Sequence, residues 1–439
     1  MIRENEWLPI EGEGESVLTT EEAAKLDTFS DERAVIDFVT PKLVKIVEAV
    51  SQQVGAPLTL VNSERHPWIH SPGDHQNKRM LKPDQFVTHT ACWDKRESKE
   101  LPHDAKAGVL SHWELRDCVF AVIEWKNLIS AGDHRALGEG IRNSECIARI
   151  TKGEKTLVHV DAVKSTRLVV ADRKGFKLVN CFEGKAKSCR FSGWDKPGSK
   201  DSLITFMSVE RPWATGLTKA CKRLGVQQIS NFLGRGAGAR AFGITKAEEA
   251  LAVKSSFGAQ STLLLQLEHT IMTEHKSLLE GTGSAVSVVQ DAGKSLYFSR
   301  SEPFAAFLVR PRGDPLPLQK QAVRSAINGL RALARNGIEH GDARHANVIW
   351  ASIAGSTDKK ALWIDFQRMS LVESEEEKKA AFQSDLQMFA ASFRQLTVRS
   401  GLGNVLWDSL SCNHFESTSD DCADDLMAVF QPVWSNSVS

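Results

Sequence analysis

The spacing of apolar residues predicts both helices and strands in the amino-terminal half of the chain. Across residues 30–54, apolar positions recur every three or four residues, which is the period of an amphipathic helix. Thr40 and Pro41 fall inside this stretch, and a capping residue followed by proline predicts that a second helical piece begins there. Short apolar runs predict strands at residues 118–126, 166–171 and 176–182.

The carboxy-terminal half alternates strand-like and helix-like stretches. Residues 232–242 predict a strand, a glycine-rich turn and a second strand, and a third strand ends at Lys254. A helix is predicted at 261–279, a strand at 305–311 and a long helix at 316–336. The predicted apolar stripe of the first helix contains Leu264, Leu267, Ile271, His275 and Leu278.

Two domains are predicted from the length of the chain and from one break in its pattern. With 439 residues and 41% hydrophobic content, the chain can form two cores of about 200 residues each. The strand pattern breaks at residues 211–216, so we assign an α/β domain to residues 30–212 and an α+β domain to residues 213–439. Residues 1–29 form an acidic amino-terminal segment.

The composition favours a soluble intracellular protein. Lys and Arg number 55 and Asp and Glu also number 55, so the formal net charge is zero. No apolar run is long enough to span a bilayer and no signal peptide is recognisable at the start, so we expect no membrane association. The eight cysteines show neither a Cys-x-x-Cys pair nor a zinc spacing, which favours buried thiols in a reducing compartment.

Three polar side chains within residues 338–369 predict phosphoryl transfer. Asp342 is followed by Asn347 and, after a predicted strand, by Asp365. Asp342 is placed to act as a catalytic base that accepts the proton of an attacking hydroxyl group. Asn347 and Asp365 offer oxygen ligands to Mg²⁺ bound by ATP. ATP and Mg²⁺ are therefore the expected cofactors.

Residues upstream supply the parts that would bind a nucleotide. Gly234 and Gly236 lie in the glycine-rich turn, where the absence of side chains would let backbone N–H groups approach phosphates. Lys254 would hold the α- and β-phosphates and needs a carboxylate partner on the next helix. Glu268 and Glu274 both qualify. Glu274 is preferred because leucines follow it one turn later and the next strand starts soon after.

This ordered set of motifs resembles the protein-kinase family over residues 215–439, which implies a bilobal fold. Gly341 replaces the arginine that usually precedes the catalytic Asp, so activation by loop phosphorylation is not expected. Gln367 replaces the glycine that follows the Asp-Phe pair, which stiffens that turn. Arg344 stands where Ser/Thr kinases keep a lysine that contacts the transferred phosphate, which favours a hydroxyl group on a protein as substrate. Asp385 resembles the buried aspartate that tethers the catalytic loop.

The amino-terminal half carries a second candidate site. Glu124 and Lys126 lie two residues apart on a predicted strand, so they project from one face of the sheet. With Asp84 from a neighbouring strand they would bind Mg²⁺ and orient a water molecule. These three residues resemble the PD-(D/E)xK nuclease core. The resemblance implies a restriction-endonuclease-like α/β domain that acts on nucleic acid, with all three as catalytic residues and the two acids as metal ligands.

Two further features of this half leave alternatives open. An extra acid for the site is either Glu48, on the first predicted helix, or Glu64. Basic residues outnumber acidic ones across residues 164–200, which suits contact with a phosphate backbone. A solvated lysine-rich surface explains the same excess equally well.

A nuclease-like domain followed by a kinase-like domain is similar to the effector portion of Crinkler-type proteins. The resemblance implies delivery into a host cell, often to its nucleus, although the leucine-rich header of that family is not recognisable here. The first hypothesis is a Ser/Thr-type protein kinase fused to a DNA-cleaving domain. The alternatives are a nuclease regulated by a nucleotide-binding pseudokinase lobe, and a small-molecule kinase of the aminoglycoside type. Arg344 and the short carboxy-terminal lobe favour the first.

Overall fold

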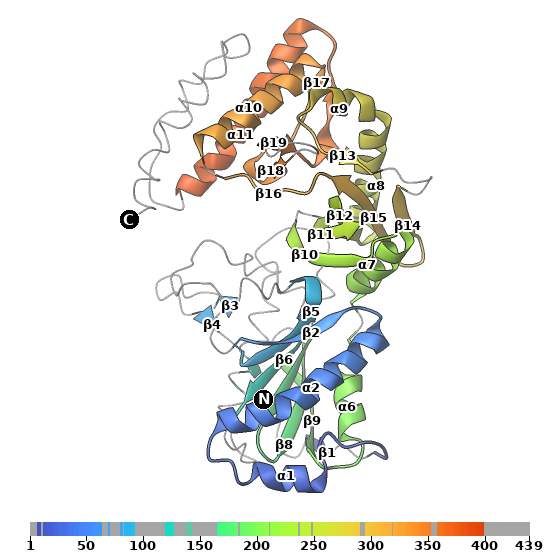
Figure 1. The fold of residues 1–439 in the computed structure, drawn as a ribbon, viewed down its shortest axis with the longest axis vertical. Coiled ribbons are helices and arrows are strands. Elements are labelled where there is room, and N and C mark those ends of the chain that lie inside the picture. Colours follow the sequence, from blue (N-terminus) through green and yellow to red (C-terminus); the bar gives the residue numbers. More distant parts are fainter. Residues whose placement is uncertain are drawn as a thin grey trace. The chain divides into compact units, whose positions relative to one another are not determined.

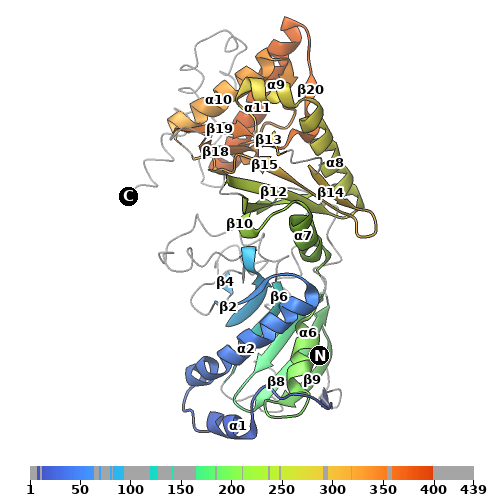
Figure 2. The same ribbon diagram turned by 45° about the vertical axis from the view of Figure 1, so that its right-hand side comes forward.

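The structure is a computed structural model (Figures 1 and 2). It describes residues 7–9, 12–63, 69–70, 80–81, 83–92, 119–126, 138, 140–141, 165–182, 185–209, 211–235, 238–246, 249–289, 295–317, 319–352 and 358–398.

The contacts of the chain divide it into two compact units, described here one at a time. The first unit comprises Met1–Lys219 and Ser230–Ala237, and the second comprises Ala220–Ile229 and Gly238–Ser439. The division falls at α7 (Pro212–Arg223) and β10 (Gln228–Arg235).

The first unit is built on a seven-stranded mixed sheet with the strand order β1-β9-β8-β7-β6-β5-β2. The strands are β1 (Trp7–Pro9), β2 (Leu58–Asn62), β5 (Gln85–His89), β6 (Val119–Trp125), β7 (Ser165–Ala171), β8 (Gly175–Phe182) and β9 (Lys185–Gly193). The pairs β1–β9 and β6–β7 are parallel, whereas the other neighbours run antiparallel. The central strands β5 and β6 are buried along their whole length.

One long helix, α2 (Glu32–Val54), lies along one face of this sheet (Figures 1 and 2). Asp31 caps its first turn. The prediction that a second helical piece begins at Pro41 is wrong, because α2 continues through this residue. The hydroxyl of Thr40 donates to the carbonyl of Ile36 at 2.6 Å, and burial of a long apolar stripe outweighs the missing N–H of proline. That stripe contains Val35, Ile36, Val39, Leu43, Ile46, Val47 and Val50.

Aromatic side chains complete the core of the first unit. The rings of Trp125 and Trp194 stack with their centroids 5.9 Å apart, and Trp194 donates its indole N–H to the carbonyl of Asp172 at 2.7 Å. The thiols of Cys92 and Cys181 are buried, as predicted. The remaining elements are α1 (Thr20–Leu26), β3 (Ile69–His70), β4 (Met80–Leu81), η2 (Thr90–Cys92) and α6 (Ser199–Met207).

The second unit contains an antiparallel sheet. Its strands follow the order β11-β12-β15-β13, with β14 beside β15. The strands not yet bounded are β11 (Ala239–Lys246), β12 (Glu249–Phe257), β13 (Ser287–Val288), β14 (Leu296–Ser299) and β15 (Phe304–Arg310). Helix α8 (Ala259–Glu274) packs against β12 and β15 and is followed by α9 (Lys276–Thr282) (Figure 2).

The remainder of the second unit is mainly helical. Helix α10 (Lys320–Arg335) and helix α11 (Glu375–Val398) pack against each other. Trp363 is fully buried beside α10 and donates its indole N–H to the carbonyl of Ala326 at 3.1 Å. The short elements are β16 (Asp314–Pro315), β17 (Ile338–Glu339), η5 (His345–Asn347), β18 (Val348–Ser352), β19 (Lys359–Trp363), η6 (Phe366–Arg368) and β20 (Ser370–Leu371). Within the ranges that the structure describes, no helix combines the length and apolar character needed to cross a membrane.

Candidate active site

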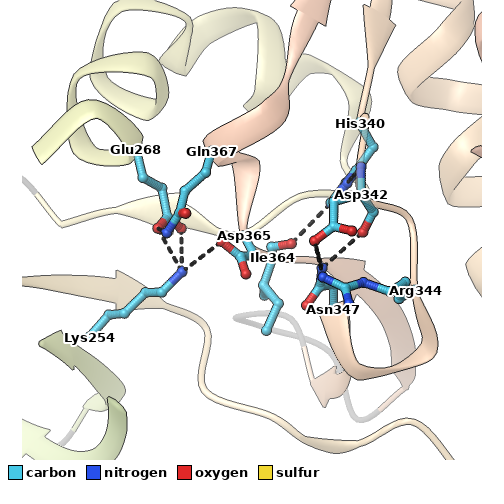
Figure 3. Close-up of polar contacts among 9 residues, drawn as sticks. All are labelled: Lys254, Glu268, His340, Asp342, Arg344, Asn347, Ile364, Asp365 and Gln367. Carbon is cyan, nitrogen blue, oxygen red and sulfur yellow. Dashed lines mark hydrogen bonds and ion pairs between the residues drawn. The ribbon is translucent and has the colours of Figure 1, made fainter. Parts of the chain in front are cut away.

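A buried lysine connects three segments of the second unit. Lys254, on the central strand β12, places Nζ 2.6 Å from Oε1 and 2.6 Å from Oε2 of Glu268 on α8. The same ammonium lies 3.2 Å from Oδ1 of Asp365, in the turn after β19 (Figure 3). The side chain of Glu268 is 2% exposed and that of Lys254 is 16% exposed, so both charges are largely shielded from water.

The prediction that Glu274 is the partner of Lys254 is wrong, because the structure pairs Lys254 with Glu268. Glu274 lies six residues further along α8, about 240° around the helix axis, and is exposed. The predicted apolar stripe was misplaced, since Leu264 and Leu267 are exposed. The buried stripe contains Ser261, Leu265, Glu268 and Met272. Glu268 stands within this stripe at spacings of three and four residues, and that is the signal which identifies it.

Burial and charge act in opposite directions on this cluster. Burial lowers the pKa of Lys254, but attraction to Glu268 and Asp365 more than offsets it, so the pKa lies above its ordinary value. Burial raises the pKa of Glu268 against the attraction of Lys254, and repulsion by Asp365 adds to the rise. Removing one member of a buried pair typically costs about 3–5 kcal/mol, because the remaining charge is then unpaired.

The loop after β17, together with the η5 turn that ends it, carries the other predicted residues. Asn347 donates its side-chain N–H to the backbone carbonyl of Asp342 at 2.8 Å and to Oδ2 of Asp342 at 3.1 Å. Arg344 donates to the same Oδ2 (Figure 3). Arg344 is 58% exposed and Asp342 13% exposed. The structure therefore brings Asp342, Arg344 and Asn347 together as one group.

A buried carboxylate holds this loop, as the sequence predicted for Asp385. Asp385, on α11, accepts the backbone N–H of His340 at 2.7 Å and that of Gly341 at 3.0 Å. Burial raises the pKa of Asp385 to about 7, although the two backbone donors act to lower it. The tether satisfies two loop donors that would otherwise be buried without a partner.

His340 links this loop to the segment that carries Asp365. Its Nε2 donates to the carbonyl of Ile364 at 3.0 Å, and its Nδ1 accepts the N–H of Asp342 at 3.3 Å. A backbone bond of 3.0 Å from the Ile364 N–H to the Asn347 carbonyl runs beside it. These bonds require a neutral ring, and burial lowers the pKa of His340 to about 4.

Two residues of the site adopt left-handed backbone conformations. Asp365 has φ 70° and ψ 61°, which is uncommon for a residue with a side chain and is concentrated at functional sites. Gly341 has φ 72°, and a Cβ there would lie 2.3 Å from the carbonyl oxygen of Arg368. The absence of a side chain at Gly341 therefore allows the loop that carries Asp342 to approach η6 closely.

The polar and charged side chains of the site are of the types that a magnesium-bound nucleotide would need. Lys254 could pair with phosphate oxygens, and Asp365 and Asn347 could offer hard oxygen ligands to the cation. The amide nitrogen of Asn347 is directed to Asp342, which leaves its amide oxygen for a cation. In the described residues, no cluster of three or more His, Cys, Asp or Glu side chains is arranged to hold a metal by itself.

The glycine-rich turn is described in part. Gly234 lies in β10, and Gly236 lies outside the described residues, so their contact with phosphates stays a prediction. Gly238 provides a close approach that the sequence interpretation missed: a Cβ there would lie 2.9 Å from Oγ of Ser261, in the first turn of α8. The signal was its place at the end of the glycine-rich turn, directly before β11.

In the first unit, the structure places Asp84 beside the end of β6. Asp84 accepts the backbone N–H of Trp125 through Oδ2 at 2.7 Å. The antiparallel register pairs Gln85 with Ile123, so Asp84 lies opposite Glu124 on the neighbouring strand. Glu124 is 2% exposed.

Lys126 lies near Asp84 and Glu124, whereas Glu48 lies on α2. Lys126 follows β6 directly and donates its backbone N–H to the carbonyl of Ala171 at 2.9 Å, so the three predicted residues gather at one end of the β5–β6 pair. Glu48 is exposed on α2. Gln85 contacts Thr40 of α2 at 2.9 Å and Trp125 contacts Gln85 at 3.0 Å. Gln85 and Trp125 therefore project from the face of the sheet that α2 covers. By strand alternation Glu124 projects from the other face, away from α2 and from Glu48.

Glu64 and the basic residues of the stretch 164–200 were also predicted to serve the first unit. Glu64 lies outside the described residues. Part of the basic excess is neutralised within the chain, because Lys174 pairs with Asp27 at 2.6 Å and Lys200 pairs with Glu15. Contact of this stretch with nucleic acid stays a prediction.

Comparison with known proteins adds little beyond this geometry. No protein-family model matches the chain, and no curated protein matches it. A crystal structure of a kinase domain is similar over 39% of this chain and 64% of its own length, with 13% sequence identity and a TM-score of 0.28. The chain thus spans less than two thirds of that structure.

Replacing Gly341 tests the close approach of the loop to η6. We expect Gly341→Ala to lower the free energy of unfolding by at least about 2 kcal/mol, because the residue must leave a left-handed conformation or displace the Arg368 carbonyl. Urea unfolding measures this loss. Gly281→Ala is the matched control, since its Cβ meets no atom within 4 Å; equal stability of the two variants would contradict the assignment.

The buried neutral His340 predicts a pH dependence of stability. In the unfolded chain this ring gains a proton below its ordinary pKa of 6.5, whereas in the folded chain it stays neutral down to about 4. The folded pKa is the lower one, so unfolding becomes easier as pH falls from 6.5 to 4, by at most about 1.4 kcal/mol per pH unit. His340→Phe should remove this contribution. Parallel urea titrations of both proteins from pH 4 to 8 measure it, and identical slopes would count against a neutral His340.

Proposed function

We propose that the second unit is an ATP- and Mg²⁺-dependent, kinase-like phosphotransferase. The observation that carries this proposal is the placement of the Lys254 ammonium between the carboxylates of Glu268 and Asp365. Asp365 is joined through the backbone of Ile364 to Asn347, which contacts Asp342. A phosphate-binding cation, oxygen ligands for a metal and a candidate base thus share one connected framework. The sheet with α8, followed by the part containing α10 and α11, supports a bilobal kinase-like fold for this unit.

Each side chain has a role in the proposed reaction. Asp342 accepts the proton of the attacking hydroxyl group, whose oxygen forms a bond to the γ-phosphorus while the bond from the γ-phosphorus to the bridging oxygen of the leaving ADP breaks. Lys254 orients the α- and β-phosphates, and Glu268 holds Lys254 in place. Asn347 and Asp365 would hold Mg²⁺, which supplies charge neutralisation on the phosphates when bound.

The substrate we propose is a hydroxyl group on a protein, of the Ser/Thr type. Arg344 supports this because its exposed guanidinium lies against the candidate base, where a cation would suit a transferred phosphate. Only residues 369–374 lie between η6 and α11, so no large substrate-binding insert occupies this interval. An aminoglycoside-type kinase, which would need such an insert, is therefore the weaker alternative.

For the first unit we propose a Mg²⁺-dependent nuclease of the PD-(D/E)xK type. The observation that favours it is the placement of Asp84 against the end of β6, opposite Glu124. Lys126 follows Glu124 two residues later in the sequence. Two carboxylates in this arrangement suit a divalent cation, and a lysine suits orientation of water or stabilisation of phosphate charge. Fusion of the two activities supports a Crinkler-type effector that acts in a host cell, with nucleic acid as a further partner. Regulation of the nuclease by a nucleotide-binding pseudokinase is the alternative.

Two substitutions separate chemistry from nucleotide binding in the second unit. Asp342→Ala should lower kcat by about 10²–10⁴-fold with ATP affinity kept, because the acid acts on the incoming hydroxyl group. Asp365→Ala should also lose Mg²⁺-dependent ATP affinity. The assays are transfer from radiolabelled ATP, to the protein itself and to generic protein substrates, and calorimetric nucleotide binding. Asp314→Ala, at a mainly exposed ion pair, is the control; transfer by Asp342→Ala at the wild-type rate would refute the assignment.

Cleavage assays test the first unit. Glu124→Gln and Lys126→Ala should each abolish Mg²⁺-dependent cleavage of DNA or RNA, because each removes a group needed for metal binding or charge stabilisation. Glu21→Gln changes an exposed glutamate on α1 and should cleave like the wild type. Thermal unfolding of each variant shows that the fold is kept. Absence of cleavage by the intact wild-type protein would leave the site as a binding module at most.

A further inference from the structure

Gln367 contacts the same carboxylate as the buried lysine. Its side-chain N–H donates to Oε2 of Glu268 at 3.1 Å, while Lys254 reaches both oxygens of Glu268. Figure 3 shows the two side chains converging on Glu268 from different segments. Gln367 thus joins η6, which follows Asp365, directly to α8.

We infer that Gln367 is a positioning residue that latches η6 to α8 and so keeps Lys254, Glu268 and Asp365 assembled without a covalent modification of the chain. The inference rests on the proposed phosphotransferase function and concerns how its site is regulated. A glycine at this position has no side-chain donor and would leave the segment free to turn. Here the amide supplies a bond that any outward movement of α8 must break.

The need for this bond follows from the burial of Glu268. A carboxylate offers about four acceptor positions, and the Glu268 side chain is 2% exposed, so water has little access to them. Lys254 supplies one donor group to both oxygens, and the amide of Gln367 supplies a second donor to Oε2. Loss of the amide donor would leave part of a buried charge unsatisfied, which is the costly case for a polar group in a protein interior.

The segment that carries Gln367 is held from its other side as well. The close approach of Gly341 to the Arg368 carbonyl fixes one flank of η6. Phe366 is fully buried, with its ring centroid 5.0 Å from that of His340. Helix α8 packs against η6. Because the catalytic loop anchors η6, the Gln367 bond transmits that anchoring to α8 and to Glu268.

Gln367→Met tests the latch, since methionine has a similar length but no N–H donor. We expect kcat/KM for ATP to fall about tenfold, the usual effect of losing one hydrogen bond to a charged group. Hydrogen exchange should rise together in residues 265–272 and 365–371. Gln321→Met makes the same change at an exposed position on α10 and should leave both measurements unchanged. Gln367→Gly should show a larger effect than Gln367→Met.

A double-mutant cycle distinguishes a latch from a general loss of stability. In a Glu268→Gln background the carboxylate is absent, so Gln367→Met should cost less than about twofold there. An equal, additive loss in both backgrounds would overturn the inference. If the wild type neither transfers phosphate nor binds ATP, the proposed function fails, and hydrogen exchange alone decides the latch. Exchange in Gln367→Met indistinguishable from the wild type in both segments would disprove it.

Discussion

A single ammonium group, that of Lys254, determines how the second unit is assembled. A buried cation must be paired, and its two carboxylate partners come from α8 and from the turn after β19. Lys254 itself is fixed by register, since it faces Ala241 on β11 and Phe307 on β15 within the sheet. The strands, the helix and the turn therefore have to meet at one point for the charge to be compensated.

The loop that carries Asp342 meets a related constraint through hydrogen bonds to its backbone. Its backbone donors are satisfied by Asp385, and its histidine bonds to the carbonyl of Ile364, next to Asp365. The result is a continuous set of short bonds from α11 through the loop to the strand that presents Asp365. Because most of these bonds involve the backbone, the spacing of Asp342 and Asp365 depends little on the flexibility of exposed side chains.

The order of the motifs allowed the main candidates to be predicted from the sequence. Asp342, Asn347 and Asp365 lie close to the ends of strands and Lys254 lies inside an apolar run, but their meeting was predicted from the resemblance of this ordered set to the kinase pattern, since Lys254 and Asp365 lie 111 residues apart. The partner of Lys254 did not follow, because two exposed leucines in α8, Leu264 and Leu267, were assigned to the buried stripe and the true buried positions include a glutamate. The contact of Gln367 joins elements 99 residues apart, and no local pattern reports it. Regular alternation along strands predicted that Glu124 and Lys126 share a face, and Asp84 was added through the resemblance to the nuclease core.

The conformation of Gly341 also limits which residues its position can accept. Exchanging one residue for another is often imagined as a change of side chain alone. Here the peptide has turned into a region that favours glycine, and the carbonyl of Arg368 occupies the space of a side chain. Placing an arginine here would require the backbone on both sides to be rebuilt first. A cation at this position is thus opposed by main-chain shape, and accommodating one would take several coordinated changes.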